Sequence, residues 1–515
     1  MRQTLCGLMI ALALTGCTVG PDYRRPPLNI PGAYRGATPA VISQHGAFAD
    51  LEWWKLFQDE QLQALINTAL EQNYDLRIAA TRILQARAQV IIARSFQFPT
   101  VDATVAAPLE QLAGGNRPPF GGAGGAEALD QTFLPQGGFS VAWELDLWGR
   151  FRRATEAARA ELLASEDFQA AVVLTLISDV ARAYFELREL DLELEISRST
   201  VASRAEYVRL TKAREEGGVA TLLDVRQAEQ LYYAATAVVA DVRGRIELQQ
   251  NLISVLIGMN PEAVQRGRSL TEQALAPSLP PGLTSDLLRR RPDILLAEQQ
   301  LVAANARIGE AKALLFPSVV ISGFAGVGGA VINGSAFGPF GAFQALPTVT
   351  LPVFNAGRLR ANVDFNDAAT QEAVLRYQQV VLQAFRDVSD GLFQYRRAQE
   401  VRVEAEATVQ TQRDALRLAN LRYEGGVASF LEVLITERDL FDFELALARV
   451  QRDELLAVVQ LYRALGGGWQ AVDPSPNQTG VPERRLRLVS RPTTEAAPGA
   501  PPGGEVGSCR GAACR

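Results

Sequence analysis

Two stretches of 67 residues, 150–216 and 358–424, most constrain the folds open to this chain, because helix-breaking residues are nearly absent from them. The first stretch contains neither Gly nor Pro, and the second contains only Gly391. At a rise of ~1.5 Å per residue, an uninterrupted helix over either stretch would be about 100 Å long. Helices of that length far exceed those of ordinary globular domains, so they must pack along their length as coiled coils.

Each long stretch belongs to one copy of an internal tandem repeat. Residues 216–220 (EGGVA) recur as residues 424–428, 208 residues later, and Gly149 recurs as Gly357 at the same spacing. A Phe-Pro pair precedes each of these landmarks in the same order. Landmarks repeated in one order indicate a duplicated unit rather than two or three independent domains.

Each repeat predicts the same order of elements: a helix, two short strands with a Gly-rich connection, a very long helix, a Gly-Gly turn and a return helix. In the first repeat these are the helix 62–96, strands at about 99–108 and 137–147, and helices 150–216 and 220–258. In the second they are the helix 283–315, strands at about 317–328 and 345–354, and helices 358–424 and 428–465.

The N-terminus has the pattern of an export signal. Arg2 is followed by an apolar run, and residues 14–17 (LTGC) resemble a bacterial lipobox, in which Cys17 is acylated after cleavage. The alternative is an ordinary signal peptide with a chance Cys. Thr18, rather than Asp, follows the cysteine, which favours the outer membrane of a Gram-negative cell. Stable anchoring needs a second attachment besides one lipid chain.

The chain ends in a Pro-, Gly- and Arg-rich stretch that predicts a flexible tail. Its two cysteines, Cys509 and Cys514, could form a disulfide in an oxidising periplasm. The expected division of the chain is a signal peptide over 1–16, a lipid-anchored segment over 17–60, repeats over 61–260 and 261–470, and the tail over 471–515.

The strands decide whether the helices form a stand-alone rod. Between residues 139 and 147, apolar side chains alternate with small or acidic ones, which predicts one apolar and one wet face. No residue of 313–355 is charged, and the strand lengths suit transmembrane β-strands. Four strands cannot close a barrel, so the sheet must close by oligomerisation of two, three or four chains. Its lumen would carry Asp102, Glu144 and Asp146, an acidic lining or simply hydrated groups.

The composition excludes several classes of protein. The 515 residues include one His, His45, and four Cys, so neither a zinc site nor a hydrolase centre with a His base can be assembled. A formal net charge of -6 lacks the excess of basic residues that is typical of nucleic-acid-binding proteins. No stretch after the signal has the roughly 20 consecutive apolar residues of a transmembrane helix. We therefore expect no enzyme, no metal or other cofactor and no nucleic-acid partner.

Short motifs along residues 17–469 resemble the outer-membrane efflux lipoproteins of the TolC superfamily, in the OprM/NodT-like branch. Each motif is weak by itself, but their common order on the repeat is specific. They are residues 20–23 (GPDY), 53–54 (WW), 73–76 (NYDL), 290–294 (RRPDI), 316–318 (FPS), 465–469 (LGGGW) and both Gly-Val turns.

The resemblance implies an α+β membrane protein. It would be a homotrimer with a transmembrane barrel of twelve strands, four from each chain, and a long coiled-coil helical barrel in the periplasm. The implied partners are outer-membrane lipid, a periplasmic adaptor (a membrane fusion protein) and an inner-membrane pump of the RND type.

The two Gly-Gly turns would lie at the periplasmic tip. Thr221 with Asp224, and Ser429 with Glu432, fit capping boxes that restart a helix after each turn. By resemblance, the surfaces that meet the adaptor are the turn residues Gly217, Gly218, Val219, Gly425, Gly426 and Val427.

By the same resemblance, the tip would be gated by Arg422 and Tyr423, with Glu215 and Glu216 of the other hairpin as partners. Ala428 occupies a position where some relatives carry an acidic residue, which argues against a carboxylate ring there.

The function implied is a passive trimeric duct that exports small toxic compounds across the periplasm and outer membrane. One alternative is an outer-membrane channel for type I protein secretion, although such relatives usually lack the acylated cysteine. Another, of a different class, is a structural coiled-coil lipoprotein that braces the envelope and forms no membrane barrel.

Overall fold

The computed structural model describes residues 18–36, 58–107, 109–112, 130–273, 284–332 and 335–467. The signal peptide over 1–16, Cys17 and the tail with Cys509 and Cys514 lie outside the described residues. Among the helices described, none combines the length and the apolar character needed to cross a bilayer.

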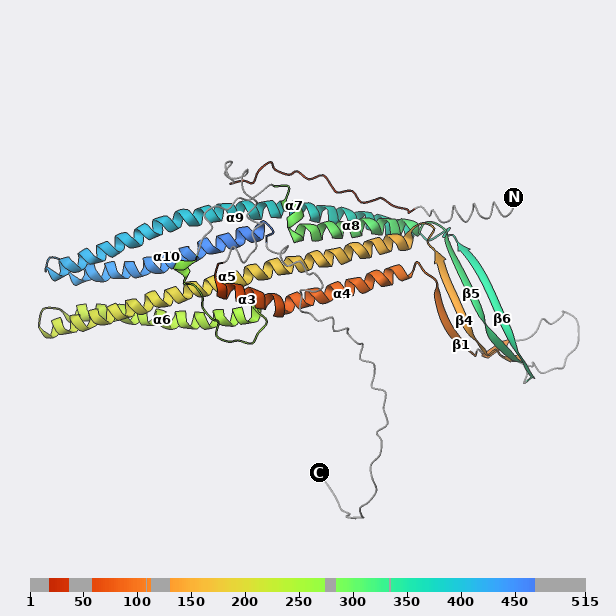
Figure 1. The fold of residues 1–515 in the computed structure, drawn as a ribbon, viewed down its shortest axis with the longest axis horizontal. Helices are drawn as coiled ribbons and strands as arrows, with labels where there is room; N and C mark the ends of the chain where they lie inside the picture. The colour runs from red at the N-terminus through yellow and green to blue at the C-terminus, as the bar shows by residue number, and fades with distance from the viewer. Residues whose placement is uncertain are drawn as a thin grey trace, which may run out of the picture. The chain divides into compact units, whose positions relative to one another are not determined.

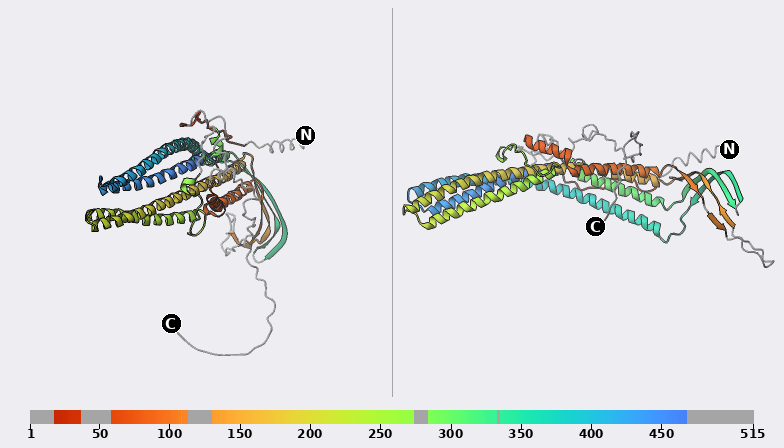
Figure 2. Two further views of the ribbon diagram at one scale, coloured as in Figure 1. Left: turned by 60° about the vertical axis from the view of Figure 1, so that its left-hand side comes forward. Right: turned by 90° about the horizontal axis from the view of Figure 1, so that it is seen from below.

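Two helical hairpins dominate the fold (Figure 1). The long helices α5 (Arg150–Glu216) and α9 (Arg358–Glu424) each have 67 residues, and the return helices α6 (Leu222–Leu256) and α10 (Phe430–Ala464) each have 35. Gly149 and Gly357 precede the long helices with φ of +78° and +85°, a conformation that favours glycine. The hairpins lie side by side, with α10 packed against α5 (Figures 1 and 2).

Each single helix expected before the strands is in fact two helices, so that part of the prediction was wrong. The pairs are α3 (Glu60–Gln72) with α4 (Tyr74–Ser95), and α7 (Leu287–Arg290) with α8 (Pro292–Ala313). Asn73 breaks the first pair, because its side chain caps α4 at Leu76 N (3.0 Å) and donates to Leu256 O (2.9 Å). Pro292 breaks the second pair, because proline has no N–H to continue a preceding helix.

The strands form one antiparallel sheet. Its long members are β1 (Thr100–Ala106), β4 (Gln136–Leu145), β5 (Ser318–Ile332) and β6 (Ser335–Thr350), hydrogen-bonded in that order. Two short strands, β2 (Leu109–Leu112) and β3 (Asp130–Phe133), pair with each other, and β3 also pairs with β5. The sheet follows directly from α4 and α8 and leads into α5 and α9.

The second pair of strands is longer than the sequence predicted. The expected strands at 317–328 and 345–354 left the Gly-rich residues between them as a loop, but these residues continue the ladder, with Gly341 opposite Val327. The register shifts between Gly328 and Ala330, which marks an irregularity inside the hairpin.

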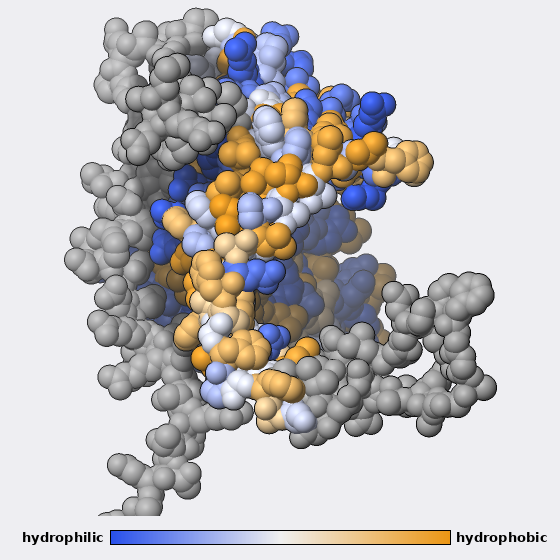
Figure 3. All heavy atoms as spheres, turned by 90° about the vertical axis from the view of Figure 1, so that its right-hand side faces the viewer, coloured by the Kyte–Doolittle hydropathy of each residue, from blue (hydrophilic) through white to orange (hydrophobic). Residues whose placement is uncertain are grey.

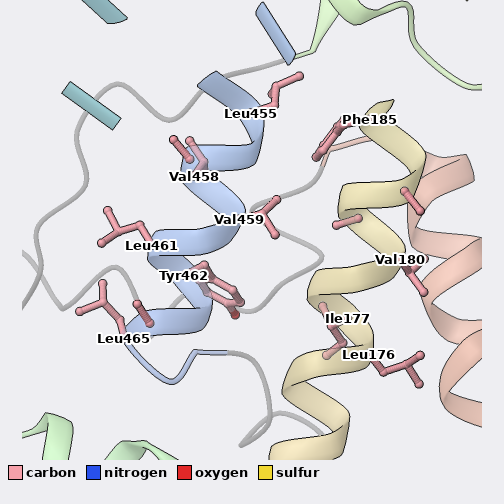
Figure 4. Close-up of a cluster of buried hydrophobic side chains, with 14 of the residues drawn as sticks. Leu176, Ile177, Val180, Phe185, Leu455, Val458, Val459, Leu461, Tyr462 and Leu465 are labelled. Carbon is pink, nitrogen blue, oxygen red and sulfur yellow. The ribbon is translucent and has the colours of Figure 1, made fainter. Parts of the chain in front are cut away.

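The main core lies where α5 and α10 cross the middle of the helical region (Figure 4). Phe185 points from α5 towards α10, and Val459 and Tyr462 point from α10 towards α5. Tyr184 and Tyr462 are 0% and 1% exposed. The labelled residues of α5 are Leu176, Ile177, Val180 and Phe185, those of α10 are Leu455, Val458, Val459, Leu461 and Tyr462, and Leu465 directly follows α10. A separate cluster of alanines joins α5 to α8, so these helices approach closely.

The N-terminal segment 18–36 crosses the surface of α5 and α8. Val19 N donates to Trp148 O (3.0 Å) at the start of α5, and the Asn305 side chain of α8 donates to Pro21 O (2.9 Å). Tyr23 and Arg25 both bind the Glu298 carboxylate, at 3.1 and 2.8 Å. Segment 18–36 is therefore fixed to one face of α8, the face that carries Glu298 and Asn305.

Candidate functional site

The two Gly-Gly turns have nearly the same backbone geometry. In the first, Gly218 N donates to Glu215 O (2.9 Å) and Val219 N donates to Arg214 O (2.8 Å). In the second, Gly426 N donates to Tyr423 O (3.1 Å) and Val427 N donates to Arg422 O (3.0 Å). Both close the helix end with the hydrogen bonds of a Schellman motif, for which Gly218 and Gly426 adopt φ of +71° and +72°.

The two turns differ in how the next helix starts. A capping box is present at Thr221, whose backbone N–H donates to the Asp224 carboxylate (2.8 Å) while Asp224 N donates to Thr221 Oγ1 (3.3 Å). The second expected box is absent: the Ser429 side chain makes no capping bond, and Glu432 contacts Arg422 instead. The nearby arginine competes for the carboxylate that would have completed the box.

Apolar side chains project from both turns. Val219 is 81% exposed and Val427 is 70% exposed, and Leu222, Leu223 and Leu431 next to them are also exposed. Exposed apolar side chains that gather in this way are typical of interaction surfaces, and we call each turn a tip. Gly217, Gly218, Gly425 and Gly426 form the backbone of these tips.

Within one chain, Arg422 pairs inside its own hairpin rather than with Glu215 or Glu216. Its Nε lies 3.2 Å from Glu432 Oε1, in its own hairpin, while Glu215 and Glu216 are exposed on the other hairpin. Tyr423 makes the contact between hairpins at this level, because Arg214 of α5 lies 4.5 Å from the centre of its ring. The Tyr423 ring also packs against Phe430, with centroids 5.1 Å apart.

Two further contacts join the hairpins near the tip, and sequence reasoning missed both. Tyr207 of α5 donates to the Asn420 side chain of α9 (3.3 Å), beside a small apolar cluster that includes Phe430. Arg204 of α5 binds Glu437 of α10, and both side chains are buried. Burial raises the pKa of the Glu437 carboxyl, which Arg204 partly offsets.

The expected lumen residues divide into two groups. Glu144 contacts Arg150 (2.9 Å), and Asp146 accepts hydrogen bonds from Phe151 N (3.2 Å) and Arg152 N (3.0 Å). Asp146 therefore caps the start of α5, and both carboxylates contact the first turn of that helix. Asp102 lies within β1, opposite Ser140 of β4.

The register gives the sheet one continuous apolar face. Val141 lies opposite Val101 on one side and Gly323 on the other, so these residues share a face with Phe139 and Ile321. Much of this face is uncovered: Val101, Val105, Phe139, Val327, Phe343 and Val349 are each more than 60% exposed. Figure 3 looks at the end of the molecule that carries the strands and shows apolar surface there.

Residues 290–294 (RRPDI) have a clear structural role. The guanidinium of Arg291 binds Asp293 (2.6 Å), Asp387 of α9 (3.1 Å) and the carbonyl of Ala464 at the end of α10 (3.1 Å). Arg291 therefore fixes the start of α8 to the second hairpin. Within the described residues, no group of three or more His, Cys, Asp or Glu side chains is arranged to hold a metal ion.

Comparison with known proteins finds one family and close relatives. The sequence profile of the family "Outer membrane efflux protein" matches twice, over residues 65–259 and 283–467, which agrees with a tandem repeat. The toluene efflux pump outer membrane protein TtgF of Pseudomonas putida is 34% identical over 490 residues, covering 92% of this chain and 99% of TtgF. The cation efflux system protein CusC of Escherichia coli is 30% identical over 461 residues, covering 90% of this chain and 98% of CusC.

The fold matches solved channels as well. The structure of the outer-membrane channel OprN superposes with a TM-score of 0.79 at 32% identity, covering 88% of this chain and all of OprN.

Proposed function

This chain belongs to the outer membrane efflux protein family, as an outer-membrane channel of an efflux pump, and we propose that it works as a passive homotrimeric duct in a tripartite assembly. Its partners would be a periplasmic adaptor (membrane fusion protein) and an inner-membrane RND-type pump. The duct would export small toxic compounds and perform no chemistry of its own. The observation that carries this proposal is the apolar face of an open sheet on a chain with two exposed apolar tips.

The open sheet supports the trimer. β1 and β6 are the outer members of the four long strands, and an unpaired edge in lipid leaves backbone groups without partners at several kcal/mol each. Pairing the β1 edge of one chain with the β6 edge of the next removes those edges, and three chains would make a barrel of twelve long strands. The wet face, with Asp102 and Glu144, would then line the lumen, and Asp146 would lie at its periplasmic entrance.

The turns support an adaptor contact and a gate. Gly217–Val219 and Gly425–Val427 would dock to the adaptor through the exposed Val219 and Val427. The gate would consist of Arg422 and Tyr423 of the second hairpin with Glu215 and Glu216 of the first. Tyr423 would contribute most within one chain, because it already contacts Arg214 across the hairpins.

The N-terminal segment supports lipid anchoring in the outer membrane. Acylation of Cys17 would place the lipid one residue before Thr18, next to the start of α5 where the strands end. The barrel would be the second attachment that firm anchoring needs. The helical barrel would lie in the periplasm.

Expression of the full chain in a Gram-negative strain that lacks its own efflux channel, together with an adaptor and an RND-type pump, tests the proposal. We expect a heat-modifiable oligomer in outer-membrane fractions, single-channel steps in planar bilayers and restored resistance to toxic compounds. Export of a protein substrate without restored resistance would instead favour a type I secretion channel. A protein with no channel steps and no β-rich circular dichroism would be the structural lipoprotein.

A further inference from the structure

The face of α8 opposite segment 18–36 lines two recesses. On α8, Glu298 and Asn305 contact segment 18–36, whereas Gln300 and Arg307, about 200° around the helix from them, line the recesses. Two recesses lie on this opposite face, with volumes of about 720 and 710 Å³. Both include Glu161 and Arg307, so they form one continuous surface, which we call the inner wall.

The inner wall runs from the sheet into the helical region. Its part near the sheet includes Thr100, Ala142, Glu144 and Val320, which the register places on the wet face of the strands. Its other part is formed by α4, α5, α8 and α9. In a closed trimer, this surface would be continuous with the lumen.

The charged side chains of the inner wall balance one another. Four arginines and four glutamates line the two recesses. Three contacts pair most of them within the wall: Arg307 with Glu161, Arg376 with Glu372 (2.5 Å), and Arg150 with Glu144 (2.9 Å).

The remaining two charged side chains, Arg82 and Glu310, have opposite signs. Arg82 lies over the ring of Phe168, 5.4 Å from its centre. Burial raises the pKa of the Glu310 carboxyl, which Arg150 and Arg307 partly offset. The inner wall therefore has many charges but no net charge over this length.

We propose that these ion pairs make the inner wall indifferent to the sign of a permeant's charge, so that it conducts organic solutes that are neutral, cationic or anionic. This inference rests on the proposed function and adds specificity-determining residues to it. A wall lined by uncompensated carboxylates would concentrate cations and repel anions. Here three of the four arginines cancel that field at close range, and the guanidinium and carboxylate groups still offer hydrogen bonds to a passing solute.

The apolar side chains of the wall fit the same cargo. Phe96 and Phe151 stack with centroids 5.9 Å apart, and Phe168 adds a third ring. Rings between ion pairs give an amphipathic organic solute both apolar and polar contacts without a deep binding pocket. Among the described lining residues there is no Met, Cys or His, the ligands that soft metal ions prefer.

Ion selectivity of the full-length channel in planar bilayers tests the inference. The reversal potential under a KCl gradient would be measured at low salt, where charges are screened less. We expect a ratio of potassium to chloride permeability on the order of one for the unmodified chain. The double variant R307Q/R376Q leaves Glu161 and Glu372 uncompensated and should raise that ratio by about twofold or more. The double variant E161Q/E372Q should lower it by a similar factor, and the quadruple variant should return it to the starting value.

The side chains of the pairs with Glu161 and Glu372 are between 41% and 69% exposed, so neutral substitutions should leave folding intact. R243Q is the control, because Arg243 is exposed on α6 and lines neither recess. Three results would overturn the inference and leave the proposed function standing. They are a shift from R243Q as large as those of the double variants, no shift from either double variant, and strong cation selectivity of the unmodified channel. A chain that gave no conductance steps would overturn the proposed function itself.

Discussion

Arg204 of α5 and Glu437 of α10 form a buried ion pair, in which the arginine Nε lies 3.0 Å from both carboxylate oxygens. The same guanidinium donates to Leu231 O of α6 (2.8 Å) and lies over the Phe441 ring, 5.1 Å from its centre. One side chain thus joins three helices of two hairpins, just before the apolar cluster at the tip.

Removal of one partner of this pair should destabilise the hairpin contact strongly. Arg204→Met leaves the Glu437 carboxylate buried without compensation, at a cost of roughly 3–5 kcal/mol. The double variant R204M/E437L replaces both charges by apolar groups and should lie close to the unmodified protein. Thermal unfolding followed by helical circular dichroism measures both, and a double variant as unstable as R204M would contradict this account.

Two glycines should respond in opposite directions to alanine. A Cβ on Gly267 would lie 2.1 Å from Asp59 Oδ1, in a network where Asp59 Oδ2 accepts from Tyr184 (2.8 Å) and Arg268 N (3.0 Å). Gly267→Ala should therefore lower the melting temperature by several degrees. Gly244, inside α6, has open space where its Cβ would be, so Gly244→Ala should raise stability by about 0.5–1 kcal/mol.

The sequence was most informative where Gly and Pro punctuate the chain. They delimit α5 and α9, whose bounds coincide with the two long uninterrupted stretches. The break at Asn73 was missed because Asn weakly disfavours helix, and its effect depends on a bond to Leu256 O far along the chain. The expected strand at 345–354 was shorter than β6 because Gly and Pro usually interrupt the hydrogen bonding of a strand. Here the long hairpin of β5 and β6 keeps these residues paired.

The contacts between the hairpins near the tip could not be predicted from the sequence, for a different reason. Arg204 and Glu437 are 233 residues apart, and charged residues on long helices usually face solvent. The pattern of charges therefore could not identify this pair. Phe324 lies on the wet side of β5, where its ring covers Gly138 and Gly326.

The two faces of β4 should differ sharply in their tolerance of charge. Val141 lies on the apolar face and Ser140 on the wet face of the same strand. An arginine at a lipid-facing strand position costs about 2–4 kcal/mol near the bilayer midplane. Val141→Arg should therefore reduce the heat-modifiable protein in outer-membrane fractions, while Ser140→Arg should leave it nearly unchanged. Equal losses would show that Val141 does not face lipid.

The packing of α5 against α10 around Glu189 and Arg452 should become less stable as pH rises through neutrality. Glu189 is buried, and that burial, with the nearby Glu193 carboxylate, raises its pKa to about 7, against the opposing effect of Arg452 and Arg245. The folded chain thus holds a proton on Glu189 that the unfolded chain loses near its ordinary pKa of 4.5. Stability from this group is present in full below that ordinary value and is lost as pH rises towards and through 7.

Glu189→Gln should therefore raise the melting temperature at pH 8 and flatten its decline between pH 5 and pH 8. Glu195→Gln, an exposed residue of the same helix, is the matched control. Thermal unfolding at several pH values measures the effect as a difference from the unmodified chain. An unchanged slope in the Glu189 variant would contradict the assignment.

The contact of Arg214 with Tyr423 should hold the tip closed more firmly than Arg422 does. A cation over an aromatic ring contributes about 0.5–2 kcal/mol, and this one bridges the two hairpins. The Arg422–Glu432 pair stays within one hairpin, and its side chains are 56% and 44% exposed, so it should contribute little.

Tyr423→Ala should therefore increase single-channel conductance in planar bilayers, and Arg214→Gln should do so to a similar extent. Arg422→Ala should have the smaller effect, and Arg417→Ala, an exposed residue of the same helix, should have none. If Arg422→Ala left conductance unchanged, Arg422 would have no part in the gate. If Tyr423→Ala also left it unchanged, the hairpin contact within one chain would not close the tip, and closure would have to come from contacts between chains.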